Sequence, residues 1–206
     1  MWIAGVDEAG RGPIAGPVVA ACVVLPPRHT LTGIADSKQL TPAQREALYD
    51  AITRHALAWA IGLASPREIE RYNILQASLL AMRRAVLALP IPPQQVLVDG
   101  KYAIPNLPLP QQAVVGGDAQ EESIAAASIL AKVARDRIMR ELDRLYPQYG
   151  FAQHKGYPTA LHLERLRMYG ACPAHRRTYA PVAQLRLLAA TAEVEEHNQR
   201  VGVQQD

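Results

Sequence analysis

Four carboxylates share one local setting, in which each follows a short apolar run. These are Asp7, Glu8, Asp99 and Asp118. Such runs are typical of short strands, and ligands of open α/β sheets bind outside the carboxyl ends of the strands. If these strands are neighbours that point the same way, the four side chains meet in one shallow site.

Carboxylates crowded into one site raise one another's pKa and are unstable unless they are protonated or bridged by cations. Mg²⁺ prefers oxygen ligands and is commonly held by protein carboxylates plus substrate phosphates. Four carboxylates suffice for two such ions flanking a scissile phosphate, one generating hydroxide and the other stabilising the leaving oxygen. The alternative for a single aspartate is a turn former or a helix N-cap, and for Asp118 that alternative needs nothing more.

Positive charge is concentrated toward the carboxyl end of the chain. The formal net charge is +3, whereas residues 151–190 carry +5, because six basic residues face Glu164 alone. The six are Lys155, Arg165, Arg167, Arg176, Arg177 and Arg186. Such a segment suits a phosphate backbone, and a solvated surface that keeps the protein soluble explains the charge equally well.

Composition limits the class of protein. With 206 residues, of which 49% are hydrophobic, the chain can build one cored domain. No apolar run approaches the roughly 20 residues that span a bilayer, and Asp7 and Glu8 interrupt the region that a secretory signal keeps apolar. We therefore expect neither a membrane nor an exported protein. Cys22 and Cys172 form no disulfide or zinc pattern, which favours a reduced cytoplasmic compartment.

Apolar runs, caps and helix breakers predict alternating strands and helices. We expect strands near residues 2–6, 18–25, 57–63, 95–99 and 113–115. We expect helices near residues 41–56, 73–89, 118–145 and 159–169, with N-cap signals at Thr41, Ser65 and Asp118. Residues 1–146 are expected to form a core and 147–190 a helical substrate-binding segment of the same domain, whereas 191–206 form a disordered tail.

The run Gly5-Val6-Asp7-Glu8-Ala9-Gly10-Arg11-Gly12-Pro13 resembles a motif of the type 2 ribonucleases H, specifically of bacterial ribonuclease HII. Further segments resemble that family in its order. They are Asp36-Ser37-Lys38, Val98-Asp99-Gly100, residues 123–133, His154-Lys155-Gly156-Tyr157-Pro158-Thr159 and His175-Arg176-Arg177. The resemblance covers roughly residues 2–185, and so many ordered motifs do not agree by chance.

The resemblance implies a ribonuclease H-like α/β fold: a mixed five-stranded sheet flanked by helices, with a C-terminal helical segment. It implies an endonuclease that uses two Mg²⁺ or Mn²⁺ ions and hydrolyses the RNA strand of RNA–DNA hybrids. Cleavage 5′ of single ribonucleotides in duplex DNA is implied as well, leaving 5′-phosphate and 3′-hydroxyl ends. The setting would be removal of misincorporated ribonucleotides and RNA primers in the cytoplasm, by a protein that we expect to be a monomer.

The resemblance also assigns roles to residues. Metal-binding catalytic carboxylates would be Asp7, Glu8, Asp99 and, less directly, Asp118. The backbone of Gly10-Arg11-Gly12 would read the ribose 2′-hydroxyl, which distinguishes RNA from DNA. Other substrate contacts would be Tyr157 against the sugar on the DNA side, Ser37 and Lys38 on a phosphate, and Lys155, Arg176 and Arg177. Gly116 departs from the family, which usually has lysine there, so a cation near Asp118 is missing.

Two other functions stay open. In a rival enzyme, His154 or His175 acts as general acid and base with Lys155 while the 2′-oxygen attacks, which leaves a cyclic phosphate. The simpler interpretation, which we favour, places both histidines on the surface, and Tyr157 has an equally simple alternative as a packed loop aromatic. A non-catalytic module that binds hybrids or structured RNA through residues 151–190 is the other possibility.

Overall fold

The computed structural model describes residues 1–34, 40–185 and 187. Ser37, Lys38, Arg186 and the expected tail 191–206 lie outside the described residues. The strands are β1 (Ile3–Ala9), β2 (Val18–Val24), β3 (Ala58–Ala64), β4 (Gln95–Asp99) and β5 (Gln111–Val114). The helices are α1 (Pro42–His55), α2 (Pro66–Leu87), α3 (Glu122–Leu145), α4 (Phe151–His154) and α5 (Ala160–Tyr169), with a short 3₁₀ helix at Gly117–Ala119.

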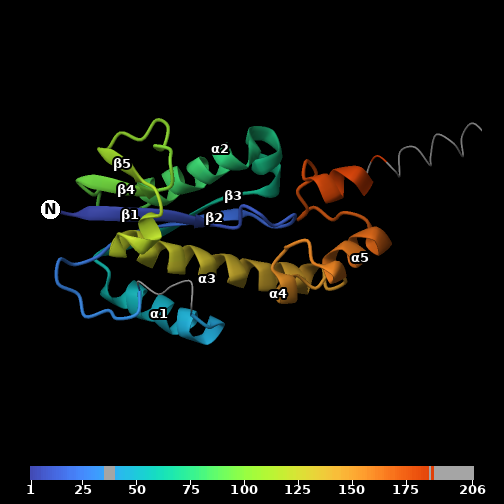
Figure 1. Ribbon diagram of the computed structural model, residues 1–206, viewed down its shortest axis with the longest axis horizontal. Coiled ribbons are helices and arrows are strands. Elements are labelled where there is room, and N and C mark those ends of the chain that lie inside the picture. Colours follow the sequence, from blue (N-terminus) through green and yellow to red (C-terminus); the bar gives the residue numbers. More distant parts are fainter. Residues whose placement is uncertain (35–39, 186, 188–206) are drawn as a thin grey trace, which may run out of the picture.

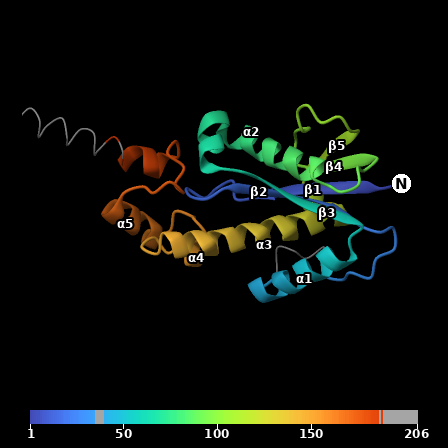
Figure 2. The ribbon, with the colours of Figure 1, turned by 180° about the vertical axis from the view of Figure 1, so that it is seen from behind.

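The five strands form one mixed sheet in the order β3-β2-β1-β4-β5. β1 pairs antiparallel with β2, which pairs antiparallel with β3, whereas β1 pairs parallel with β4 and β4 with β5. Helix α2 covers one face, and α3 with α1 covers the other (Figures 1 and 2). This arrangement confirms the expected mixed five-stranded α/β fold. It also places the carboxyl ends of the parallel strands β1, β4 and β5 at the same end of the sheet, where α/β proteins bind ligands.

Helix α3 passes close to β1 at a point where the strand carries a glycine and the helix carries a run of alanines. A Cβ atom at Gly5 would lie 2.2 Å from the backbone nitrogen of Ile124, so glycine is required where β1 passes under the helix. The alanines at 125–127 are buried against this face. Close packing of an alanine-rich helix holds β1 at a fixed depth, which matters because β1 carries the acidic residues.

Local signals placed most helix starts correctly. Thr41 and Ser65 each form a capping box with the residue three positions on, and Pro42 and Pro66 occupy first-turn positions. The helix expected from about residue 73 is the second part of α2. Asn73 kinks that helix with a φ of 65°, and its Oδ1 accepts a hydrogen bond from the Gln76 N–H.

Two local expectations were wrong. Asp118 does not cap the long helix, because Gly116 with a φ of 65° turns the chain into the separate 3₁₀ helix and α3 begins later, at Glu122. Asp7 and Glu8 do not follow the first strand but lie inside it. β1 stays paired with β2 as far as Ala9, whereas its pairing with β4 ends at Val6, so the carboxylates occur where the parallel partner stops.

The segment after α3 packs against the turn that joins β1 to β2. His175 forms an isolated antiparallel bridge with Ala15, and the Ile14 N–H donates to the Gly156 carbonyl at 2.9 Å. Figure 1 shows α4 and α5 at the end of the molecule beyond this turn. Among the described residues there is no helix with the length and apolar character to cross a membrane.

Candidate active site

Three of the four expected carboxylates meet at the edge of the sheet. One oxygen each from Asp7, Glu8 and Asp99 lies within 4.8 Å of the others. Asp7 and Glu8 come from β1, and Asp99 is the last residue of β4, the parallel neighbour of β1. The N–H of Gly117 fixes Asp99 by donating to its Oδ1 at 2.8 Å. Parallel pairing of β1 with β4 therefore brings together carboxylates that lie some ninety positions apart.

The charges of this cluster are not compensated within it. Burial, followed by the charges of Glu8 and Asp99, holds the pKa of Asp7 well above its ordinary value. Burial also raises the pKa of Glu8, although Arg11, 3.5 Å from Glu8 Oε1, opposes the shift. Glu8 Oε2 is buried without a hydrogen-bond partner among the described residues. A buried carboxylate oxygen that nothing in its surroundings satisfies calls for a cation.

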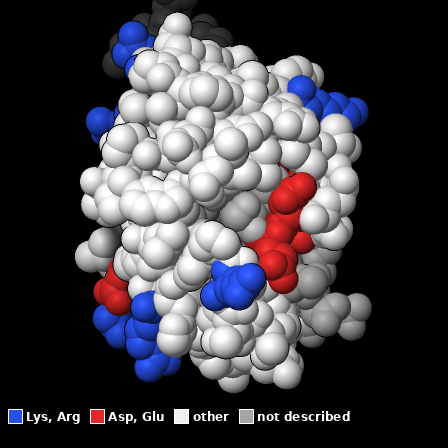
Figure 3. All heavy atoms as spheres, turned by 90° about the vertical axis from the view of Figure 1, so that its left-hand side faces the viewer, with Lys and Arg blue, Asp and Glu red and all other residues white. Residues whose placement is uncertain are grey.

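The donor set fits a hard divalent metal ion. All three ligand groups are carboxylates, the chemistry that suits Mg²⁺ and Mn²⁺ better than the softer metals that favour thiolate or imidazole. The groups are close enough to share an ion, and the carboxylate that lacks a partner points to the same need. Figure 3 shows that a strip of acidic side chains also lies on the face at the left-hand side of Figure 1.

Asp118 is not part of the three-carboxylate group. It lies half-buried in the 3₁₀ helix, directly after Gly117, which binds Asp99 through its backbone. Gly116, at the position where the resembling family usually has lysine, supplies the left-handed residue that starts this helix. The structure thus places Asp118 beside the cluster, and its role as a metal ligand stays a prediction.

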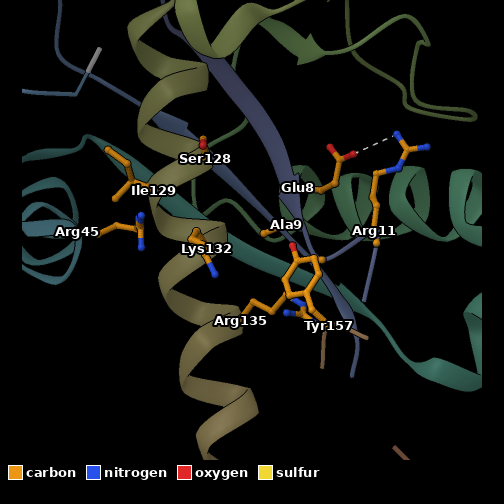
Figure 4. Close-up of a pocket in the computed structure, with 11 residues that line it drawn as sticks. Glu8, Ala9, Arg11, Arg45, Ser128, Ile129, Lys132, Arg135 and Tyr157 are labelled. Atoms are coloured by element: carbon orange, nitrogen blue, oxygen red, sulfur yellow. Dashed lines mark hydrogen bonds and ion pairs between the residues drawn. The ribbon is translucent and has the colours of Figure 1, made fainter. Parts of the chain in front are cut away.

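A cleft of about 400 Å³ opens next to Glu8. Residues 9–12 line it together with Tyr157, and Figure 4 shows Lys132 of α3 and Arg45 of α1 across from them. Of the described cationic side chains in its wall, Arg45 and Lys132 were not among the substrate contacts expected from the sequence. Lys132 lies in the family-like segment 123–133 but was not assigned a substrate contact there, and Arg45 of α1 lies in no such segment.

Two buried arginines fix the backbone of the Gly10-Arg11-Gly12 loop and of the turn that follows it. The guanidinium of Arg176 donates to the carbonyls of Gly10 and Arg11, the latter at 2.9 Å, and also to those of Gly16 and Pro17. Arg135 donates to the carbonyls of Ala15, Pro17 and Lys155 at about 3 Å. Burial lowers the pKa of Arg135 to about 10. Sequence reasoning missed Arg135, whose signal was a basic residue on the apolar face of α3.

Arg176 therefore differs from its expected role. Its side chain is completely buried and donates to backbone carbonyls and to the Tyr179 hydroxyl, so it supports the loop and is not exposed to a substrate. The hydroxyl of Tyr179 also donates to the Arg11 carbonyl, at 2.8 Å. The loop backbone is thus fixed from below, while its upper surface faces the cleft.

Tyr157 is exposed to the cleft and does not fit the alternative of a packed loop aromatic. Tyr157 is 44% exposed, and a Cβ atom at Gly12 would lie 3.6 Å from its Cε1, so the ring lies beside the loop. Lys155 is half-buried and its Nζ donates to the Ala152 carbonyl. Arg177 is exposed, and its backbone N–H donates to Glu70 Oε1. Substrate contacts by Lys155 and Arg177 stay predictions, as do those of Ser37 and Lys38.

The expectation that His154 and His175 lie on the surface was wrong. Both are buried, together with His162, which the sequence did not single out, and desolvation lowers the pKa of His162 and of His175 to about 4. Among the described residues that line the cleft there is no histidine. These rings were misjudged because the turn after α5 folds back under the loop, a long-range contact that local polarity does not reveal.

The chain resembles known proteins over nearly its whole length. The family profile described as ribonuclease HII matches residues 4–182. The ribonuclease HII of Polaromonas sp. is 60% identical over 183 residues, 89% of this chain and 92% of that protein, and the one of Nitrosospira multiformis is 56% identical over 184 residues, with the same coverage. The crystal structure of ribonuclease H2 from Pyrococcus horikoshii OT3 is 32% identical and superimposes with a TM-score of 0.77, covering 90% of this chain and 97% of that one.

Proposed function

Because the chain belongs to the ribonuclease HII family and is thus a ribonuclease H, we propose that it hydrolyses the RNA strand of RNA–DNA hybrids at the cluster of Asp7, Glu8 and Asp99. We propose further that it cleaves 5′ of a single ribonucleotide in duplex DNA and leaves 5′-phosphate and 3′-hydroxyl ends. The observation that carries the proposal is one of adjacency. Glu8 lies both in the carboxylate group and in the wall of the cleft that the Gly10-Arg11-Gly12 loop and Tyr157 line.

Asp7, Glu8 and Asp99 would hold the metal, with Asp118 as the proposed fourth ligand. A bound pair of Mg²⁺ or Mn²⁺ ions supplies activation of the attacking water and stabilisation of the leaving oxygen. The protein's own contribution is to fix the ligands. The Gly117 N–H orients Asp99, and the Glu8 N–H donates to Asp7 Oδ1 at 2.7 Å. Ligands held in this way need little reorganisation when the substrate binds.

The loop would select ribose by backbone contacts. Gly10 has a φ of 94° and, like Gly12, no side chain, so a sugar can come close to the main chain. The Arg176 guanidinium donates hydrogen bonds to the Gly10 and Arg11 carbonyls from the protein interior, which keeps these peptide planes from turning. The Tyr157 ring beside Gly12 would pack on the neighbouring sugar. A deoxyribose lacks the hydroxyl that this backbone would contact, so the site would leave plain DNA uncut.

Lys132 and Arg45 give the cleft a cationic wall opposite Glu8 that suits the phosphates of a duplex. Lys132 is held in place by Asp136, whose Oδ1 lies 2.6 Å from its Nζ. Nucleic acid is therefore the proposed partner, and we keep the expectation of a monomer in the cytoplasm.

The decisive experiment uses a DNA duplex that carries one ribonucleotide, incubated with Mg²⁺, with Mn²⁺ or with EDTA. We expect cleavage on the 5′ side with either metal and none with EDTA, and end-group analysis should find a 5′-phosphate. Asp7→Asn should abolish cleavage, whereas the matched change Asp50→Asn on the exposed surface of α1 should not. A cyclic phosphate would instead support the histidine mechanism.

The binding module remains the second candidate, because residues 151–190 carry their excess positive charge whatever the carboxylates do. A pure binder should retain the hybrid in EDTA and after Asp7→Asn with no cleavage under any condition. Salt titration of binding in EDTA separates the two functions, since the nuclease should show salt-sensitive binding together with metal-dependent turnover.

A further inference from the structure

Two buried histidines connect Tyr157 to the segment that ends in Arg176. The first, His162 of α5, has its Nδ1 at 2.9 Å from the Tyr157 carbonyl oxygen. Its Nε2 lies 3.0 Å from Nε2 of His175. Nδ1 of His175 in turn accepts from the Cys172 N–H at 3.0 Å. His162 and His175 are at most 1% exposed, so both rings are shielded from bulk solvent.

The partners dictate where the protons lie. A carbonyl oxygen only accepts, so Nδ1 of His162 carries hydrogen, and in a neutral ring its Nε2 is then bare. The Nε2 of His175 must donate to that atom, which leaves Nδ1 of His175 bare, as the Cys172 N–H on its other side requires. The two ends of the chain thus demand the same arrangement. Protonation of either ring would set two N–H groups against each other at 3.0 Å.

The connection continues from His175 into the loop. His175 bridges Ala15, and the N–H of its neighbour Arg176 donates to the Ile14 carbonyl at 2.8 Å. The Arg176 side chain then reaches the carbonyls of Gly10 and Arg11. An unbroken set of short contacts therefore runs from the Tyr157 backbone to the backbone of the loop.

Packing leaves the two rings one arrangement. His154 stacks on His162 with ring centroids 4.2 Å apart, and Phe151 meets the edge of His162 at 5.5 Å. Tyr149 contacts His175 at 4.9 Å. His154 has its own partners, the Tyr149 carbonyl and the Gly156 N–H, so it supports the pair without joining the chain. Rings enclosed in this way cannot turn to alternative partners, which makes the link stiff.

We propose that His162 and His175 are positioning residues that hold Tyr157 at a fixed distance from the Gly10-Arg11-Gly12 loop. The tyrosine and the loop, the two groups proposed to contact the ribonucleotide junction, then keep one fixed geometry relative to each other. The proposal deepens the proposed function and rests on it. Neither histidine touches the substrate; each acts through the backbone of a residue that does.

The first test needs no substrate. Two-bond ¹H–¹⁵N correlation spectra of the histidine-labelled full chain report which ring nitrogen carries hydrogen. We expect the Nδ1–H tautomer for His162 and the Nε2–H tautomer for His175 at neutral pH. The Nε2–H tautomer in His162 would remove the donor to Tyr157 and overturn the proposal, whatever the enzyme does.

The second test uses side chains that copy one ring nitrogen each. In His175→Gln the amide nitrogen takes the place of Nε2 and can still donate to His162, whereas in His175→Asn the amide replaces Nδ1 and the link to His162 is lost. On a duplex with one ribonucleotide, we expect kcat/KM of the asparagine variant to fall at least about tenfold below that of the glutamine variant, because small displacements of positioning groups are costly. Equal values in two variants of equal thermal midpoint would overturn the proposal.

A double-mutant cycle shows whether the effect passes through Tyr157. In a Tyr157→Ala background no ring remains to be positioned, so the difference between the two His175 variants should disappear. A difference that persists there contradicts the proposal. Val86→Ala, which truncates a core side chain of α2, controls for general loss of stability. When it is introduced into both His175 variants, the ratio of their kcat/KM values should stay unchanged. If the wild-type protein fails to cleave the single-ribonucleotide duplex, the proposed function fails, and the tautomers alone then decide whether the link exists.

Discussion

Arg135 occupies the space that a side chain at position 10 would need. A Cβ atom on Gly10 would lie 2.0 Å from Arg135 Nε, and Arg135 cannot retreat because it is buried and donates to three backbone carbonyls. The φ of 94° at Gly10 adds backbone strain for any other residue. Gly10 and Arg135 thus form one unit in which each fixes the other.

Gly10→Ala should therefore lower the free energy of unfolding by about 1–3 kcal/mol. Urea unfolding measures the change. Gly12→Ala is the matched comparison, because the nearest atom to its Cβ is Tyr157 Cε1 at an ordinary 3.6 Å, and we expect a loss of no more than about 0.5 kcal/mol. Equal losses in the two variants would contradict the steric account of the loop.

Asp7→Asn should separate activity from stability. We expect cleavage to fall at least about 100-fold, because a ligand at the reaction centre is lost. In EDTA, however, the variant should be more stable than the wild type by about 0.5–2 kcal/mol, since it removes a buried charge next to Glu8 and Asp99. Thermal unfolding in EDTA measures this gain, and a loss of stability would show that the cluster is not strained without cations.

Mg²⁺ should stabilise the wild type and not the variants that lack a ligand. At a free concentration about 100 times Kd, one bound ion raises the free energy of unfolding by about 2.7 kcal/mol. We expect this rise to be lost in Asp99→Asn, and EDTA should reverse it in the wild type. Calorimetric unfolding across a Mg²⁺ titration measures it, and Asp118→Asn, tested alongside, reports whether Asp118 contributes to the site.

Arg176→Met should be strongly destabilising although it is not a direct substrate contact. The change removes the donors to the buried carbonyls of Gly10 and Gly16, and we expect the free energy of unfolding to fall by about 3 kcal/mol together with weakened cleavage. Arg177→Met next to it, on the exposed surface, should change stability by less than about 0.5 kcal/mol. Urea unfolding of both variants is the measurement, and equal effects would contradict the buried role of Arg176.

The contribution of His162 and His175 to the free energy of unfolding should fall on acidification below neutral pH. His162 and His175 have folded-state pKa values of about 4, below the ordinary 6.5, so the unfolded chain binds more protons between these values. Neutral rings contribute fully above about pH 6.5, and the contribution is lost as the pH falls toward 4, with a slope of up to about 1.4 kcal/mol per pH unit for each ring. Urea unfolding between pH 4 and 7 measures the slope. Replacing the exposed His55 by glutamine should leave it unchanged, whereas His175→Gln should reduce it.

Local sequence patterns predicted the helix starts and strands, whose formation depends on neighbouring residues. The capping boxes at Thr41 and Ser65 and the strand runs were found because a few neighbouring residues determine them. The convergence of Asp7 with Asp99 followed from one further assumption, that their strands are parallel neighbours, which pairing of β1 with β4 bears out. The family resemblance was confirmed by the relatives and the fold.

What failed depended on contacts between distant segments. The burial of Arg176 and of the histidines comes from the folding of the last segment against the turn after β1, and nothing in their own neighbourhood indicates it. Asp118 was misplaced for a local reason instead. A glycine with positive φ at position 116 started a separate turn before the long helix, and sequence alone did not show which turn would form.

The continuity of β1 has a consequence for where the enzyme cuts. Glu8 and Gly10 are two residues apart on one chain that runs from the strand straight into the loop. In the proposed function, Glu8 at the reacting phosphate and Gly10 at the recognised sugar are therefore held at a fixed separation by one continuous segment of backbone. This fixed separation would place each incision at the same phosphodiester bond relative to the ribose, whatever the surrounding bases.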